Sequence, residues 1–310
     1  MATLLDARQV FGQGASVLLQ AATRKAKHSH VWRRGSLGEL RQHVPGPFTL
    51  TPFQHGDKAN PLYQTVISDQ GLPLAIVTGS YALINHCDLV DSLAHALEQS
   101  GLDATEYPAE LYLGDQGAKF GFRLALADFS YDPGDGYPVS GLVEIVNSAD
   151  RSLPFGLSMG HLRLVCSNGL KILESTFTLA ELHLKGRLDQ AMVDEAIARG
   201  LAQIRRGPAA FRTLHQTAVP EGFTAQLLAG VGGAWGLAAA KELERAFEGG
   251  TYRKVKIPGI STPVETLWQS YNVLVWVAGR SRDLARQVAM VEEAHTVFWE
   301  ALQAHKISLN

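Results

Sequence analysis

The sequence has few cysteines, no long apolar run and no excess of charge of one sign. Its only cysteines are Cys87 and Cys166, too few for a disulfide framework or a cysteine-rich zinc site and typical of a reducing cytoplasm. The most apolar window, residues 273–278, is far shorter than the roughly 20 residues that cross a bilayer. The formal net charge of -2 excludes a uniformly basic nucleic-acid clamp and leaves a local basic face open. We therefore expect a cytoplasmic protein with no membrane partner.

The motifs of phosphate-loop and metal chemistry are also missing. No G-x-x-x-x-G-K-[S/T] loop occurs in the chain. The glycine-rich stretch 230–236 follows helical sequence and lacks the G-x-G-x-x-G spacing, which indicates a junction between two helices. Asp88, Asp91 and His95 share one face of a predicted helix, but no further ligand stands at a matching position. The sequence thus predicts neither a metal nor a cofactor.

Hydrophobic periodicity divides the chain into a β-rich part and a helical part. Apolar side chains occupy every second position of residues 119–126, which is typical of a strand with one buried face. From about residue 181 the apolar positions recur with a helical period. The predicted fold class is α+β, an antiparallel β-sheet with a packed helix followed by an α-helical C-terminal region. We expect a helical and basic N-terminal arm (1–44), a sheet-and-helix core (45–180) and a helical C-terminal region (181–310).

Capping residues mark two helix starts. Asn85 precedes an apolar stripe that ends near Gly101, and we expect its side-chain oxygen to accept a backbone N–H of the first helical turn. The segment Thr262-Pro263-Val264-Glu265 has the pattern of a capping box with proline at the first helical position. It predicts a second helix that starts at Pro263.

An early stretch of the chain is strongly basic. Residues 24–41 include Arg33 and Arg34 with Trp32 beside them, and they hold one acidic residue, Glu39. Such a run is usually a solvated arm. Its functional interpretation is an arm whose arginines contact phosphate while the tryptophan stacks on a base.

A second basic feature is predicted on the sheet. Lys119 and Arg123 lie on the non-core face of one strand, and His161 and Arg163 share a face of another. If these strands belong to one sheet, the four side chains form a cationic stripe that follows a single-stranded phosphate backbone. The alternative is an ordinary polar face of a half-exposed antiparallel sheet.

Cys166 is the one candidate for covalent chemistry. A nucleophilic cysteine needs a base and a lowered pKa, and His161 is the nearest histidine in sequence. On a regular strand, however, His161 points to the opposite face from Cys166. A small buried residue at a strand end, followed by a turn at Asn168-Gly169, is the simpler interpretation. A cysteine-dependent hydrolase or transferase remains an alternative function.

Four segments match the pattern of one family. They are Ser80-Tyr81-Ala82-Leu83-Ile84-Asn85, Ile145-Val146-Asn147-Ser148-Ala149-Asp150-Arg151-Ser152, Arg163-Leu164-Val165-Cys166-Ser167-Asn168-Gly169-Leu170 and Thr266-Leu267-Trp268-Gln269-Ser270-Tyr271-Asn272-Val273-Leu274. In this order they resemble the phage- and plasmid-borne family called domain of unknown function 932, over roughly residues 63–278. The chain departs from the family pattern at Ala149, where a histidine is expected, and at residues 274–276, which are less polar than the end of the family's motif.

The resemblance implies a mobile genetic element in the bacterial cytoplasm and no established activity. A weaker similarity, in the order of hairpin, helix, antiparallel strands and helix, is to the core of single-strand annealing recombination proteins. Our leading hypothesis is a non-catalytic DNA-recombination accessory that binds or anneals single-stranded DNA on the basic sheet face, with assembly as a homo-oligomer left open. The motif residues that we interpret as structural, through turns, packing and side-chain-to-backbone hydrogen bonds, are Asn85, Asn147, Cys166, Asn168, Trp268 and Asn272.

A third hypothesis is a protein-binding module that interferes with a host defence system. It would need an exposed apolar patch on the C-terminal helices, where Trp268, Tyr271 and Trp276 supply candidate anchors.

Overall fold

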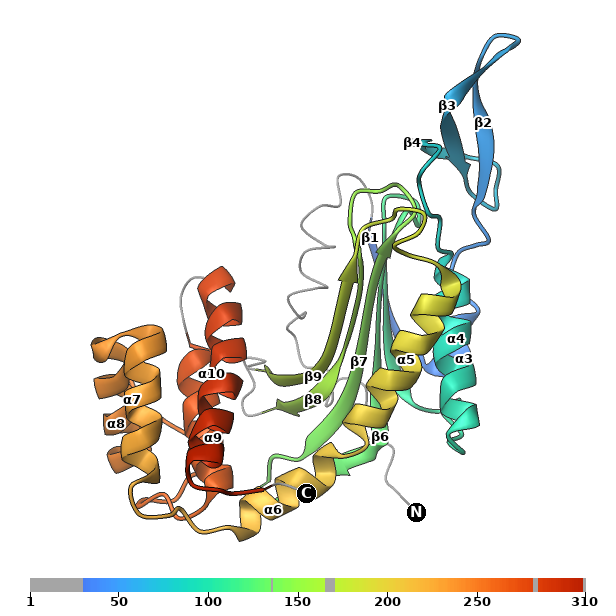
Figure 1. Cartoon of the computed structure of the whole chain (residues 1–310). Helices are drawn as coiled ribbons and strands as arrows, with labels where there is room; N and C mark the ends of the chain where they lie inside the picture. Colours follow the sequence, from blue (N-terminus) through green and yellow to red (C-terminus); the bar gives the residue numbers. More distant parts are fainter. Residues whose placement is uncertain (1–29, 135, 165–170, 281–283, 309–310) are drawn as a thin grey trace. The chain divides into compact units, whose positions relative to one another are not determined.

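Figure 1 shows the computed structural model of the chain, which describes residues 30–134, 136–164, 171–280 and 284–308. The strands are β1 (His30–Ser36), β2 (Thr49–His55), β3 (Lys58–Ile67), β4 (Pro73–Thr78), β5 (Pro108–Gly114), β6 (Lys119–Tyr131), β7 (Val139–Ser148), β8 (Phe155–Leu164), β9 (Lys171–Glu181), β10 (Thr251–Tyr252) and β11 (Val255–Lys256). The helices are α3 (Leu37–Arg41), α4 (His86–Gln99), α5 (Gln190–Ile204), α6 (Gly207–Gln216), α7 (Phe223–Trp235), α8 (Leu237–Gly249), α9 (Leu267–Ala278) and α10 (Leu284–Ala304). The sheets are antiparallel and the C-terminal region is helical, so the predicted α+β class is confirmed.

The described residues form two compact units. The first contains those of 1–128, 141–160 and 175–204, and the second those of 129–140, 161–174 and 205–310. This division differs from the three consecutive blocks expected from the sequence, because the long strands β6 to β9 contribute residues to both units.

The main sheet has six strands in the order β1-β5-β6-β7-β8-β9. β1 pairs antiparallel with β5 over its whole length, from His30 opposite Gly114 to Ser36 opposite Pro108. The short helix α3 follows at once, and Ser36 and Glu39 close its first turn as a capping box. The sequence assigned this stretch to an arm. Its described part, from residue 30 onwards, is instead the edge of the sheet and a capped helical turn.

One face of the six-stranded sheet is covered by α4 and α5 (Figure 1). The predicted stripe of α4 is buried, and burying each of Leu89, Leu93 and Leu97 contributes about 1.5–3 kcal/mol. Ser92 Oγ on α4 donates to Asp194 Oδ1 on α5 at 2.7 Å, which ties the two helices together. These contacts fix the position of the α4 N-terminus over the sheet.

Asn85 stands immediately before α4, as predicted, but it does not cap the helix. Its side-chain oxygen accepts no backbone N–H of the first turn, and its Nδ2 donates to the carboxylate of Asp88 at 3.2 Å. The Oδ1 atom instead accepts the backbone N–H of Phe48 at 2.8 Å. Asn85 therefore joins the segment before β2 to the start of α4, which is a structural function of a different kind from the expected one.

A smaller sheet, in the order β2-β3-β4, extends from the rest of the first unit, with the β2–β3 hairpin outermost (Figure 1). Its buried side forms a cluster with the segment that follows β4 and with the β7–β8 turn. The members are Phe48, Val66, Val77, Tyr81 and Ala149.

The second unit is built around α9. All of its residues except Gln269 are buried, so this helix is the centre of the C-terminal core. It begins at Leu267, after Thr266, whose side chain accepts the backbone N–H of Gln269. The predicted start at Pro263 is therefore wrong by four residues, because the second threonine, not the first, supplies the cap.

The three aromatic residues expected to anchor a docking patch on these helices lie inside the second unit. Trp268, Tyr271 and Trp276 are all buried, with exposed fractions of 3%, 5% and 1%. They fill the interior of the second unit and cannot anchor a partner from outside.

The glycine-rich stretch 230–236 is helical except for its last residue, Gly236, which is the predicted junction between two helices. α7 runs through it and ends only at Trp235, before Gly236. A Cβ atom at Gly230 would lie 2.7 Å from Cγ1 of Val297 on α10. The glycine therefore permits close approach of the two helices. Of the described helices, none has the length and apolarity needed to cross a membrane.

Candidate functional site

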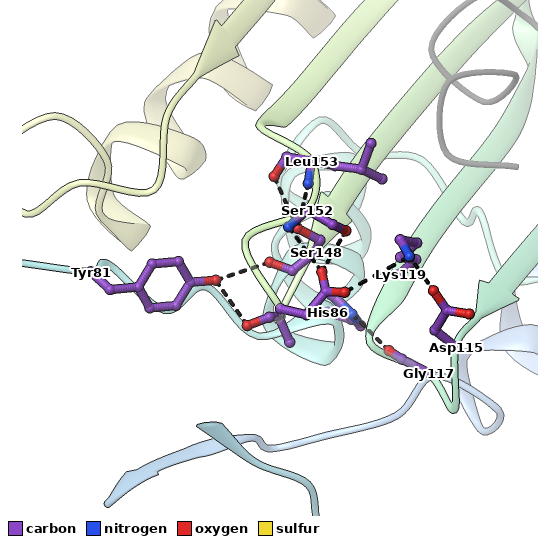
Figure 2. A network of polar contacts seen from close by, with 10 residues as sticks. Tyr81, His86, Asp115, Gly117, Lys119, Ser148, Ser152 and Leu153 are labelled. Atoms are coloured by element: carbon purple, nitrogen blue, oxygen red, sulfur yellow. Dashed lines mark hydrogen bonds and ion pairs between the residues drawn. The ribbon is translucent and has the colours of Figure 1, made fainter. Parts of the chain in front are cut away.

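Two of the matching segments meet at one end of the main sheet, as Figure 2 shows. Tyr81, from the first segment, donates its hydroxyl to the carbonyl oxygens of Ser148 and Ala149 at 3.0 and 3.1 Å. Asn147, from the second segment, donates its side-chain amide to the carbonyl oxygen of Ile84 at 2.9 Å. The polar groups of both segments are thus directed at each other and at backbone atoms, which supports the structural interpretation of Asn147.

His86 lies at the centre of this junction and is completely buried. Its Nε2 donates to the carbonyl oxygen of Gly117 at 3.1 Å, and its Nδ1 accepts from Asn147 at 3.0 Å; these partners assign the tautomer. The ring stacks on Phe120 at 4.7 Å between centroids. Burial is the main cause that lowers the pKa of His86 to about 3. The imidazole is therefore neutral at physiological pH and serves as a fixed connector.

The turn between β7 and β8 is held by its own side chains. Ser148 Oγ donates to the carbonyl oxygen of Leu153 and accepts the backbone N–H of the same residue, each at 2.9 Å. Asp150 Oδ1 accepts the backbone N–H of Ser152 at 3.0 Å and its hydroxyl at 2.5 Å. This network leaves little conformational freedom at the turn.

Lys119 is the first of the predicted DNA contacts, and it is buried in the same junction (Figure 2). Its ammonium group pairs with Asp115, four residues earlier, and lies 3.8 Å from Asp150. Only 3% of the side chain is exposed. The expectation that Lys119 faces solvent or ligand is wrong, because its charge is compensated inside the protein.

Arg123 is likewise buried and paired. Its guanidinium donates to Glu110 at 2.8 Å and to Glu144 at 2.7 Å, and Glu110 also accepts from Arg34 at 2.6 Å. The four residues form a ladder of alternating charge across β1, β5, β6 and β7, with only Arg34 substantially exposed. The ladder has no net charge. The predicted cationic stripe is therefore absent at Arg123.

His161 is also inside the protein. It is 1% exposed, its ring meets Phe211 edge to face at 4.8 Å between centroids, and a Cβ atom at Gly207 would collide with it. Arg163 lies in β8, and its side chain is outside the described residues, as are Cys166 and Asn168. The structure thus brings Lys119, Arg123 and His161 to buried positions and leaves the hypothesis on Cys166 untested.

Basic and aromatic side chains are exposed together on β1. Trp32 is 40% exposed, and its ring packs on the buried Tyr112 at 5.1 Å between centroids. Arg33 is exposed, and the side chain of Arg34 is 42% exposed. The pairing with β5 places Trp32 and Arg34 on the same face, opposite Tyr112 and Glu110.

The remaining motif residues have packing contacts. Trp268 meets Phe211 at 5.4 Å and Tyr131 at 6.1 Å between ring centroids, both nearly edge to face. Asn272 donates its side-chain amide to the carbonyl oxygen of Trp268 at 2.6 Å, one helical turn earlier. Both residues are buried within the second unit, which supports their structural interpretation.

Among the described residues, neither Cys87 nor a cluster of metal-ligating side chains offers reactive chemistry. Burial, with Asp88 as the next cause, raises the pKa of the Cys87 thiol to about 11, so it is not a thiolate at neutral pH. Within the described residues, no group of three or more His, Cys, Asp or Glu side chains has the geometry of a metal site.

Comparison of the chain with models of protein families, with curated proteins and with solved structures finds no match. The resemblance carried by the four segments stays a prediction from the sequence.

Proposed function

We propose that the protein binds single-stranded DNA along β1 and acts as a DNA-recombination accessory without catalysing a reaction. The observation that carries the proposal is the exposed Trp32, seated on Tyr112 and flanked by Arg33 and Arg34 on an edge strand. We call this surface the β1 edge (residues 30–34). It includes Arg33 and Arg34, the two arm contacts expected from the sequence, and takes the place of the cationic stripe that was expected on the sheet face.

Trp32 provides the base-binding element of the proposal. Its ring packs at a tilt against Tyr112 and the residue is 40% exposed, and an exposed aromatic ring is a platform on which unpaired bases stack. Stacking is tolerant of base identity because every base has a π-face. Sequence-independent binding, as annealing requires, follows from this contact.

The arginines provide the phosphate-binding element. Arg34 follows Trp32 on the same face at a distance of about 7 Å along the strand, so a nucleotide stacked on the indole carries its phosphate toward the guanidinium. Arg33 emerges from the other face of the same strand. Among the described strands, β5 is the one neighbour of β1, so one edge of the β1 backbone is unpaired. The N–H groups of that edge are additional donors for phosphate oxygens.

The test is binding of a labelled single-stranded oligonucleotide to the full chain across a salt series. We expect Trp32→Leu to weaken binding roughly 5- to 150-fold at constant salt, the equivalent of one lost stacking contact. Arg34→Gln is expected to reduce the slope of log K against log salt by about 0.7, as for one lost phosphate contact with a single strand.

The matched controls are Tyr63→Leu, an exposed aromatic residue of β3, and Arg212→Gln, an exposed arginine of α6. Both are expected to bind like the unmodified protein. The proposal is wrong if the unmodified protein binds no oligonucleotide, if it prefers duplex, or if the two β1 variants bind as tightly as the two controls.

A further inference from the structure

The first unit contains a concave feature that the proposed DNA site does not use. It is a cavity of about 500 Å³, a size typical of small-molecule sites. Its walls come from three segments, namely the end of β4 with Tyr81, the β7–β8 turn at 151–154, and residues 182–184 after β9. The turn is the one fixed by Ser148 and Asp150, so this part of the wall is rigid (Figure 2).

The cavity has mostly apolar walls and one formal charge. Leu153, Pro154 and Leu182 are among its apolar members, and Leu182 is 55% exposed. Arg151 is the only charged side chain of the lining, and no carboxylate of the described residues lies within ion-pair distance of it. The neighbouring Asp150 is directed at Lys119 and Ser152 instead. The cavity therefore presents one guanidinium that makes no ion pair within the described residues, above apolar surface, with the charge of the neighbouring Asp150 also acting on Tyr81 and His183.

His183 contributes a hydrogen-bond acceptor, the Nε2 atom of its imidazole. The residue is 3% exposed, and its ring stacks on Tyr81 at 5.3 Å between centroids. Its Nδ1 donates to the carbonyl oxygen of Ala82 at 3.0 Å, which fixes Nε2 as the unprotonated acceptor. Nε2 is buried and has no hydrogen-bond partner among the described residues. Burial lowers the pKa of His183, so the imidazole keeps this acceptor at neutral pH.

We propose that this cavity binds a small carboxylic acid that also carries a hydroxyl or N–H donor and an apolar body. The carboxylate pairs with Arg151, the hydroxyl or N–H group donates a hydrogen bond to Nε2 of His183 once a small shift of the wall opens this buried atom to the cavity, and the apolar part lies against Leu153 and Leu182. A single guanidinium matches a monoanion, which favours a carboxylate over a doubly charged phosphate. The site is independent of the β1 edge, and its success or failure leaves the DNA proposal unchanged.

The decisive experiment compares three related ligands on the full chain by titration calorimetry. They are 2-hydroxy-4-methylpentanoate, 4-methylpentanoate, which lacks the hydroxyl, and 2-hydroxy-4-methylpentanamide, which lacks the charge. We expect the hydroxy acid to bind most tightly, with a three- to tenfold loss for the acid without the hydroxyl and at least a tenfold loss for the amide. In a protein with ¹⁵N-labelled histidine, the Nε2 resonance of His183 should shift with the hydroxy acid and much less with 4-methylpentanoate.

Variants of Arg151 and His183 separate the contributions of the two side chains to ligand binding. Arg151→Gln should reduce the affinity for the hydroxy acid at least tenfold and leave the weak binding of the amide unchanged. Arg187→Gln, which removes an exposed arginine outside the lining, is the matched control and should bind like the unmodified protein. His183→Phe preserves an aromatic ring on Tyr81 and should remove the preference for the hydroxylated acid; if this variant fails to fold, the ligand comparison on the unmodified protein still decides.

Two results would overturn the proposal. One is the absence of saturable binding of the hydroxy acid to the unmodified protein. The other is binding that does not depend on the guanidinium, seen either as equal binding of the acids and the amide or as equal binding by Arg151→Gln and the control.

Discussion

Arg123 shows how a basic side chain can be essential to a sheet without being available to a ligand. Its guanidinium lies between Glu110 and Glu144, and all three side chains are at most 2% exposed. A buried carboxylate that loses its partner retains the full penalty of desolvation. The ladder therefore makes the stability of the sheet depend on each of its interior charges.

We expect Arg123→Leu to lower the free energy of unfolding by about 3–5 kcal/mol, because it leaves two buried carboxylates without their shared cation. Arg34→Leu removes the exposed end of the same ladder and should cost less than about 1 kcal/mol, since solvent screens that pair and Glu110 keeps its contact with Arg123. Urea unfolding at pH 7 measures both. Equal losses in the two variants would contradict the distinction between buried and exposed pairs.

His86 predicts a specific pH dependence of stability. The pKa of its imidazole falls from 6.5 to about 3 on folding, so below pH 6.5 the unfolded chain binds a proton that the folded protein does not. Stability is therefore complete above pH 6.5 and is lost progressively as the pH falls toward 3, by about 2 kcal/mol at pH 5.

The measurement is the free energy of unfolding of the unmodified protein and of His86→Gln between pH 8 and pH 5. The variant is less stable at pH 7, because it loses the stacking on Phe120, but its decline between pH 7 and pH 5 should be about 2 kcal/mol smaller. Between pH 7 and pH 8 the difference between the two proteins should stay constant. Parallel declines down to pH 5 would show that His86 does not titrate as described.

Among the elements, α7 offers a matched pair of glycines. A Cβ atom at Gly230 would lie 2.7 Å from the stiff side chain of Val297, whereas one at Gly233 would meet nothing within 4 Å. Gly230→Ala should therefore destabilise the protein by about 1–3 kcal/mol through overpacking. Gly233→Ala should stabilise it by up to about 1 kcal/mol through helix propensity. Thermal unfolding of both variants tests the close approach of α7 and α10, and a stabilising Gly230→Ala would contradict it.

The periodic elements were predictable from the sequence, and the elements defined by distant pairing were not. The stripe of α4 and the alternation of β6 follow directly from where apolar side chains recur. β1 has no such pattern, because its residues are exposed and its existence depends on pairing with β5. The capping box at Ser36 and Glu39 was present in the sequence and could have marked α3, whereas the similar pattern at Thr262 was misleading because Thr266 supplies the cap.

For the whole molecule, the main error of sequence reasoning concerned the second face of the sheet. Alternation distinguishes two faces, but it does not tell a solvated polar face from a buried one in which opposite charges are paired. Every residue of β7 is buried, and so are Lys119 and Arg123 on β6. The acidic partners come from β5, β7 and two turns, and only the folded arrangement brings them beside the basic residues. Of the six predicted contacts, Arg33 and Arg34 are exposed in the described structure.

The pairing of β1 with β5 also constrains the order of events during synthesis. His30 leaves the ribosome 84 residues before Gly114, its partner in the sheet. At about 5–20 residues per second, the segment with Val31 and Trp32 waits roughly 4–17 s for its neighbour, while the local β2–β3–β4 meander can already close. During translation, the apolar side chains of this unpaired segment are therefore exposed long enough for a ribosome-associated chaperone to bind them.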